Sequence, residues 1–209
     1  MRARPERGGL PLALALALFV MPRISQALPD GAWVIAIGQN QGDADEVTLR
    51  FAERDADQFV EALSEVGGLD PTRVVRLLGT DADTVRRALD HVATQMRAAG
   101  EGGALLVFYS GHADATALHL GGSHLPMSEL TRRVEEAPGA LRLLVIDACR
   151  SGSASRVKGM SPREEFKVAV EDRVEAEGLA IITSSTAGED SQESDSLRGS
   201  FFSHHLING

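Results

Sequence analysis

The sequence contains a single cysteine, Cys149, among its 209 residues. A lone cysteine excludes an intrachain disulfide and any zinc site built from several cysteines. Aromatic residues are also scarce, at 4%, and no apolar run reaches the roughly 20 residues that a membrane-spanning helix needs. The remaining composition, 43% hydrophobic and 24% charged, is ordinary for a globular protein, and the length fits one domain.

Basic residues are also fewer than acidic residues. The chain has 21 Lys and Arg against 30 Asp and Glu, for a net charge of −9. The acidic excess is spread along the chain without a basic stripe, so we expect no nucleic-acid partner. A chain of this charge favours basic peptides or basic protein loops as partners. Residues 38–42 lack the Lys-Ser/Thr pair of a phosphate-binding loop.

The N-terminal segment has the pattern of a secretory signal peptide. Three early arginines precede an apolar run from Leu10 to Met21, and Ser25–Gln26–Ala27 supplies small residues for a cleavage site. We therefore expect residues 1–27 to be removed and residues 28–209 to form the exported domain, periplasmic or secreted, with no membrane anchor after cleavage. The alternative is a disordered N-terminal extension.

Apolar periodicity predicts alternating strands and helices. Buried strands are expected at 32–38, 73–78, 104–109, 141–146 and 179–184. Helices are expected at 51–66, from Asp81 or Asp83 to Gly100, from Pro126 to Ala137, and at 201–206, with a hairpin at 117–125. Strands that are apolar on both faces and separated by amphipathic helices indicate an α/β fold. Its central sheet should be mostly parallel and covered on both sides.

Two of these strands run directly into reactive side chains. The strand at 104–109 leads to Ser110–Gly111–His112, and the strand at 141–146 leads to Asp147–Ala148–Cys149. The carboxyl ends of parallel strands meet at one edge of a sheet. An imidazole beside a thiol can take its proton and generate the nucleophilic thiolate. The pair predicts a cysteine hydrolase, the alternatives being a buried structural cysteine and a structural loop histidine.

The segments Tyr-Ser-Gly-His at 109–112 and Asp-Ala-Cys-Arg-Ser-Gly at 147–152 resemble the caspase-like cysteine peptidases of the C14 type. The metacaspase and bacterial caspase-like branch is the most similar. The resemblance extends in order over residues 32–209 and includes the segments at 34–38, 54–56, 183–185, 188–189 and 200–203. It implies a caspase-like three-layer α/β/α sandwich and a cysteine endopeptidase. Caspase-like domains usually continue into a further strand, so the resemblance also implies a truncated or unusually short member.

The resemblance assigns the catalytic roles residue by residue. It implies that Cys149 is the nucleophile and that His112 assists thiolate formation and protonates the leaving amine. The backbone N–H groups of Ala113 and Cys149 would bind the oxyanion. The family usually has glycine after the histidine, so Ala113 departs from its pattern, although its N–H group is retained.

The resemblance also implies a binding pocket for Arg or Lys at the P1 position of the substrate. Asp147 and Asp55 match two pocket carboxylates of the metacaspase branch, and Ser184 is expected beside them. Two carboxylates in a narrow pocket favour a guanidinium or ammonium group. The alternatives are that Asp147 hydrogen-bonds to loop amides and that Asp55 is a solvated residue or a residue in the N-terminal turn of a helix.

No cofactor or metal is expected. Residues 113–140 lack an acidic cluster of the kind through which many metacaspases use calcium, and His119 and His124 with His204 and His205 do not form a convincing metal set. Two rival interpretations remain for the whole chain. One is a related peptidase of the clostripain or gingipain type, which would need further domains. The other is a catalytically inactive caspase-like protein-interaction module.

Overall fold

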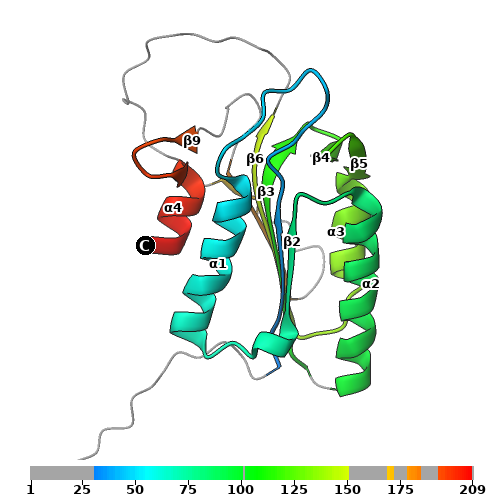
Figure 1. The fold of residues 1–209 in the computed structure, drawn as a ribbon. Coiled ribbons are helices and arrows are strands. Elements are labelled where there is room, and N and C mark those ends of the chain that lie inside the picture. The colour runs from blue at the N-terminus through cyan, green and yellow to red at the C-terminus, as the bar shows by residue number, and fades with distance from the viewer. Residues whose placement is uncertain (1–30, 101, 151–168, 172–177, 185–192, 209) are drawn as a thin grey trace, which may run out of the picture.

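The computed structural model describes residues 31–100, 102–150, 169–171, 178–184 and 193–208 (Figure 1). The signal peptide expected at residues 1–27 lies outside the described residues, and so does most of the charged segment that follows Cys149. Of the helices that are described, none is both long enough and apolar enough to cross a membrane.

The described strands form a mostly parallel sheet in the order β2-β1-β3-β6-β8-β7, with the β4–β5 hairpin added to β3. Neighbouring pairs β1–β2, β1–β3, β3–β6 and β6–β8 are parallel, whereas β7 runs antiparallel to β8. The strands are β1 (Trp33–Gly38), β2 (Val74–Leu78), β3 (Ala104–Ala113), β4 (Ala117–Leu120), β5 (Ser123–Pro126), β6 (Leu141–Arg150), β7 (Ala169–Glu171) and β8 (Leu179–Thr183). A separate antiparallel pair is formed by β9 (Glu193–Ser194) and β10 (Gly199–Ser200).

Helices cover both faces of the sheet. The helices α1 (Ala52–Gly67) and α4 (Phe201–Asn208) lie on one side, and α2 (Ala82–Ala99) and α3 (Met127–Glu135) lie on the other (Figure 1). A short 3-10 helix at Pro71–Arg73 leads into β2. The Asp81 carboxylate accepts a hydrogen bond from the Thr84 N–H at 2.7 Å and begins α2, while Gly68 and Gly100 end α1 and α2 in the left-handed conformation.

Each face of the sheet has its own hydrophobic core. Along β1, Ile35 and Ile37 belong to the core under α2 and α3, whereas Val34 and Ala36 belong to the core under α1. This alternation places apolar side chains on both faces, as in parallel sheets covered by helices on both sides. The predicted three-layer α/β/α sandwich is confirmed.

Two strands are longer than their apolar runs predict. Strands β3 and β6 each continue four residues past the predicted ends at 109 and 146, so His112 and Cys149 lie within paired strands rather than just beyond them. The extensions pair with each other, and β4 pairs with the end of β3. Strand pairing therefore extends over these polar residues, although their sequence has no apolar pattern. The short strands β7, β9 and β10 were not predicted, because two or three residues carry no periodicity.

Candidate active site

The two predicted catalytic residues occupy neighbouring positions on adjacent strands. In the parallel register of β3 and β6, the Cα atom of His112 is opposite that of Cys149, and Ser110 is opposite Asp147. The backbone of Cys149 forms part of β6, whereas its side chain is outside what the structure describes. The fold therefore brings together the two chain positions that the sequence singled out.

The hydrogen bond of His112 defines its tautomer. Its Nε2 atom lies 2.9 Å from the carbonyl oxygen of Val47, and because a carbonyl only accepts, Nε2 carries the proton. In the neutral ring the lone pair is then on Nδ1. Nδ1 is buried, has no hydrogen-bond partner in the described part of the chain, and lies 3.7 Å from Oε1 of Glu46. His112 thus presents a basic nitrogen beside a carboxylate.

The glycine before His112 is required by close packing. The buried Tyr109 hydroxyl donates a hydrogen bond to the His112 carbonyl oxygen at 2.5 Å, folding back over the intervening residues. A Cβ atom on Gly111 would lie 2.5 Å from that hydroxyl oxygen, which is closer than real Cβ contacts allow. The Ser-Gly-His sequence therefore combines a positioned histidine with a residue that has no side chain to displace the tyrosine.

Ala113 fits its position without backbone strain. It is the last residue of β3, it is buried, and it is opposite Leu118 of β4. Among the described non-glycine residues, only Arg198 has a positive φ, so the conformation at Ala113 does not call for glycine. The departure from the family pattern at this residue leaves the N–H group in an ordinary strand.

The two predicted pocket carboxylates lie together and are both buried, each 2% exposed. They line one small cavity, about 10 Å³ in volume, with Leu49, Ala52, Ser110, Gly111, Glu193 and Ser200. Asp55 accepts hydrogen bonds from the Ser200 N–H at 3.1 Å and from the Ser110 hydroxyl at 3.4 Å. Asp147 accepts hydrogen bonds from the hydroxyls of Ser200 and Ser203. A cavity of this size holds about one water molecule, so an arginine side chain enters only if the lining residues move.

Burial changes the proton affinity of Asp55. Loss of hydration raises the pKa of Asp55 to about 7; the Ser200 N–H opposes this rise and the neighbouring Asp147 adds to it. Asp55 is buried, so it is not a solvated residue, but it does lie in the first turn of α1, as the other form of that alternative expects. The described partners of Asp147 include serine hydroxyls that come from β10 and α4.

Ser184 lies apart from this cavity. Its N–H donates to the Ile146 carbonyl at 2.9 Å, and its Oγ accepts a hydrogen bond from the Ala148 N–H at 3.2 Å. These contacts tie the end of β8 to β6 immediately before Cys149. Ser184 is not among the residues that line the cavity of Asp55 and Asp147.

The loop between β1 and α1 contributes residues that the sequence did not single out. Glu46 Oε1 lies 2.9 Å from Nδ1 of His119, and Val47 accepts the hydrogen bond of His112. Burial lowers the pKa of His119, but the hydrogen bond and charge of Glu46, with Asp114 and Asp43, outweigh it and leave that pKa raised. No motif could have revealed Val47, because its contribution is a backbone carbonyl that any residue provides.

Comparisons with known proteins agree with this fold. The sequence matches the family described as Caspase domain over residues 32–209. The crystal structure of caspase-1 from Spodoptera frugiperda matches with a TM-score of 0.63 at 18% identity, over 87% of this chain and 69% of that chain. The structure of pro-sf-caspase-1 matches with a TM-score of 0.59 at 15% identity, over 85% and 68% of the respective chains. A search of curated proteins found no match.

Proposed function

Because the chain belongs to the caspase-domain family, we propose that it is a cysteine endopeptidase with a Cys149–His112 dyad. The observation that carries this proposal is the register of β3 and β6, which places the two residues opposite each other. The family supports a cysteine peptidase, and the position of the two residues in the fold supports the proposed dyad.

The tautomer of His112 supports a role in proton transfer. With Nε2–H donated to Val47, the Nδ1 atom takes the thiol proton of Cys149 and leaves a thiolate. The thiolate forms a bond to the peptide carbonyl carbon, and Nδ1–H then protonates the leaving amine as the C–N bond breaks. A water molecule then gives a proton to the same nitrogen and bonds to the acyl carbon, and the C–S bond breaks to release the carboxylic acid product and the Cys149 thiolate. Glu46, 3.7 Å from Nδ1, favours the transient imidazolium.

The oxyanion formed in these steps is assigned to the N–H groups of Ala113 and Cys149. Loss of one such donor typically costs about 2.7–4 kcal/mol of transition-state stabilisation. Ala113 retains the backbone N–H group that this role requires. The assignment itself rests on the resemblance to caspase-like peptidases.

We further propose that the enzyme cleaves after Arg or Lys. Asp55 and Asp147 line one cavity close to the dyad strands, and a cation would be held by both carboxylates. Because the cavity is small, substrate binding must displace its lining, for example the serine hydroxyls that contact Asp147. Peptide or protein substrates with basic P1 residues are therefore the proposed partners.

A peptide library that varies the P1 residue tests both proposals, with products identified by mass spectrometry. The wild type should cleave after Arg or Lys, and Cys149→Ala and His112→Ala should each abolish cleavage while retaining the far-UV circular dichroism of the wild type. Asp147→Asn should lower kcat/KM sharply for Arg substrates and less for neutral ones. Asp195→Asn, which changes a carboxylate that is 77% exposed, is the matched control and should cleave normally.

Two results would contradict these proposals separately. Preferred cleavage after Asp, or unchanged Arg selectivity in Asp147→Asn, would overturn the pocket assignment while leaving the dyad intact. A folded wild type that binds the peptides and cleaves none of them would favour the inactive protein-interaction module instead.

A further inference from the structure

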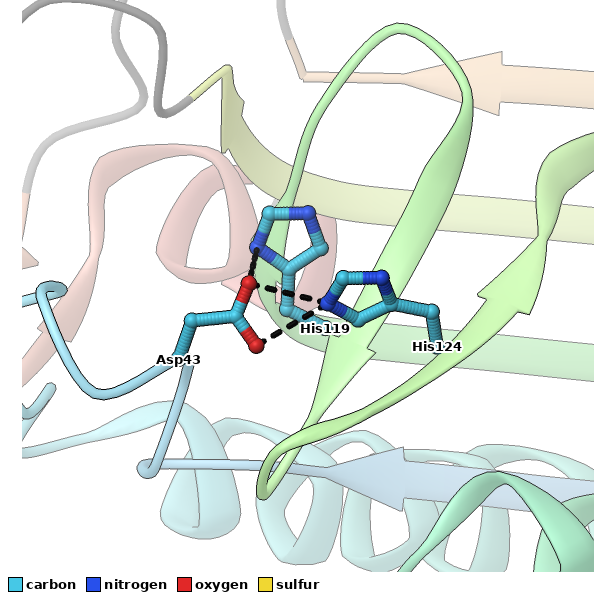
Figure 2. Close-up of side chains that lie close together, drawn as sticks. All are labelled: Asp43, His119 and His124. Atoms are coloured by element: carbon cyan, nitrogen blue, oxygen red, sulfur yellow. Dashed lines mark hydrogen bonds and ion pairs between the residues drawn. The ribbon is translucent and has the colours of Figure 1, made fainter.

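A second cluster of ionisable side chains lies beside the proposed dyad but does not include it. Asp43 comes from the loop after β1, His119 from β4 and His124 from β5, and their side chains converge (Figure 2). Nε2 of His124 lies 2.9 Å from both carboxylate oxygens of Asp43, and Nδ1 of His119 lies 3.7 Å from Oδ2. One ligand atom from each residue lies within 4.8 Å of the other two.

Two further carboxylates border the histidines. Glu46 Oε1 lies 2.9 Å from Nδ1 of His119, and Asp114 Oδ2 lies 3.4 Å from its Nε2. The rings of His119 and His124 stack with their centroids 4.7 Å apart. Three carboxylates lie beside two stacked imidazoles, and their negative charge favours a bound cation.

The donor set and the distances from Asp43 to the two histidines fit zinc. Zinc binds imidazole nitrogen and carboxylate oxygen at about 2.0–2.2 Å, so neighbouring ligand atoms in a tetrahedron lie about 3.4 Å apart. The distances of 2.9 Å and 3.7 Å from Asp43 to the two histidine nitrogens bracket that value. Calcium and magnesium prefer oxygen ligands throughout, and two imidazoles argue against both ions.

We propose that Asp43, His119 and His124 bind a zinc ion, with Glu46 or water as the fourth ligand. Asp114 faces the Nε2 atom of His119, and a proton held there would leave Nδ1 as the metal-binding nitrogen. The sequence alone led to the opposite expectation for these histidines, because it grouped them with His204 and His205 and gave no reason to include Asp43.

The site joins the loop to the β4–β5 hairpin. The same loop carries Val47, which accepts the hydrogen bond from His112, so bound zinc would also hold this carbonyl in place. This consequence rests on the proposed function, whereas zinc binding itself does not, since neither His112 nor Cys149 is a ligand.

Isothermal titration of the full chain with Zn²⁺ tests the proposal. The Cys149→Ala background removes the thiol, the other strong zinc ligand, and in it one equivalent of zinc should bind. His124→Ala and Asp43→Asn should each weaken binding more than about tenfold, since even changes behind the ligands cost 10–100-fold. The His124 side chain is 50% exposed, so its removal should spare the fold, and circular dichroism checks this. His91→Ala, at an exposed histidine of α2, is the matched control and should bind like the parent.

The same titration distinguishes the competing outcomes. Zinc binding that disappears with Cys149→Ala would place the ion at the thiol and overturn the proposal, as would parent-like binding by both cluster variants or no binding at all. Competition by millimolar Ca²⁺ or Mg²⁺ would overturn the choice of metal. The measurement requires no peptidase activity, so failure of the proposed function would leave its result unaffected.

Discussion

At the scale of single residues, Gly111 is a tightly packed position of the site, because its missing side chain accommodates the Tyr109 hydroxyl. The hydroxyl in turn contacts the carbonyl of the proposed catalytic histidine. The glycine of the Ser-Gly-His segment thus has a steric role that can be tested separately from catalysis.

We predict that Gly111→Ala lowers both the free energy of unfolding and the peptidase rate. A Cβ atom 2.5 Å from the tyrosine oxygen must displace it, and overpacking of this kind costs typically about 1–3 kcal/mol. Urea unfolding followed by circular dichroism measures the loss. Gly102→Ala is the matched control, because its Cβ would lie 3.9 Å from the nearest atom, an ordinary contact. Equal stability of the two variants would contradict the steric explanation.

A second residue-scale prediction concerns Asp55, whose pKa is raised to about 7 by burial. Between pH 4 and 7 the folded protein retains a proton that the unfolded chain releases, so this residue makes stability fall as pH rises through that window. Asp55→Asn should remove this contribution. The free energy of unfolding of the variant minus that of the wild type should therefore increase by about 1–3 kcal/mol from pH 5 to pH 8.

The measurement is the free energy of unfolding of both proteins across that pH range. Asp57→Asn changes a partly exposed carboxylate of the same helix and should follow the wild type at each pH. Parallel pH profiles for Asp55→Asn and wild type would show that the Asp55 carboxyl does not hold its proton in the folded protein.

At the scale of elements, local chemistry predicted most of the fold. The apolar runs located the five main parallel strands, and the Asp81 cap with Gly68 and Gly100 bounded α1 and α2. The polar extensions of β3 and β6 could not be predicted, because they depend on pairing with each other rather than on local pattern. The same holds for the site: Asp55 and Asp147 were recognised by motif, whereas the Val47 carbonyl has no sequence signature.

The N-terminal cap of α2 gives a prediction at this scale. Asp81→Ala should lower the free energy of unfolding by about 1 kcal/mol, because the Thr84 N–H loses its acceptor. Asp81→Asn keeps an acceptor oxygen and should remain close to wild type. Chemical denaturation compares the three proteins. If Asp81→Asn lost as much free energy of unfolding as Asp81→Ala, the effect would be due to charge rather than to capping.

At the scale of the whole molecule, the site is assembled from segments that are distant in sequence. Contacts to His112, Asp55 or Asp147 come from three parts of the chain: the loop after β1, the ends of β3 and β6, and the β10–α4 segment. None of these segments holds the site alone, so the arrangement requires that β3 and β6 pair and that α1 and α4 pack beside them.

The last prediction concerns the chain before this domain. We propose that residues 1–27 direct export, because arginines precede an apolar run and a small-residue cleavage site. Expressed in a bacterial host, the protein should be recovered outside the cytoplasm with an N-terminus near Leu28, as measured by mass spectrometry of each cell fraction. The double variant Leu14→Arg, Leu16→Arg interrupts the apolar run, and its chain should remain uncleaved in the cytoplasm. Arg2→Lys keeps the positive charge, and this variant should be exported normally. Wild-type protein recovered from the cytosol with Met1 intact would contradict the proposal, and a cleaved, exported product that persists in the double arginine variant would show that the apolar run is not the signal.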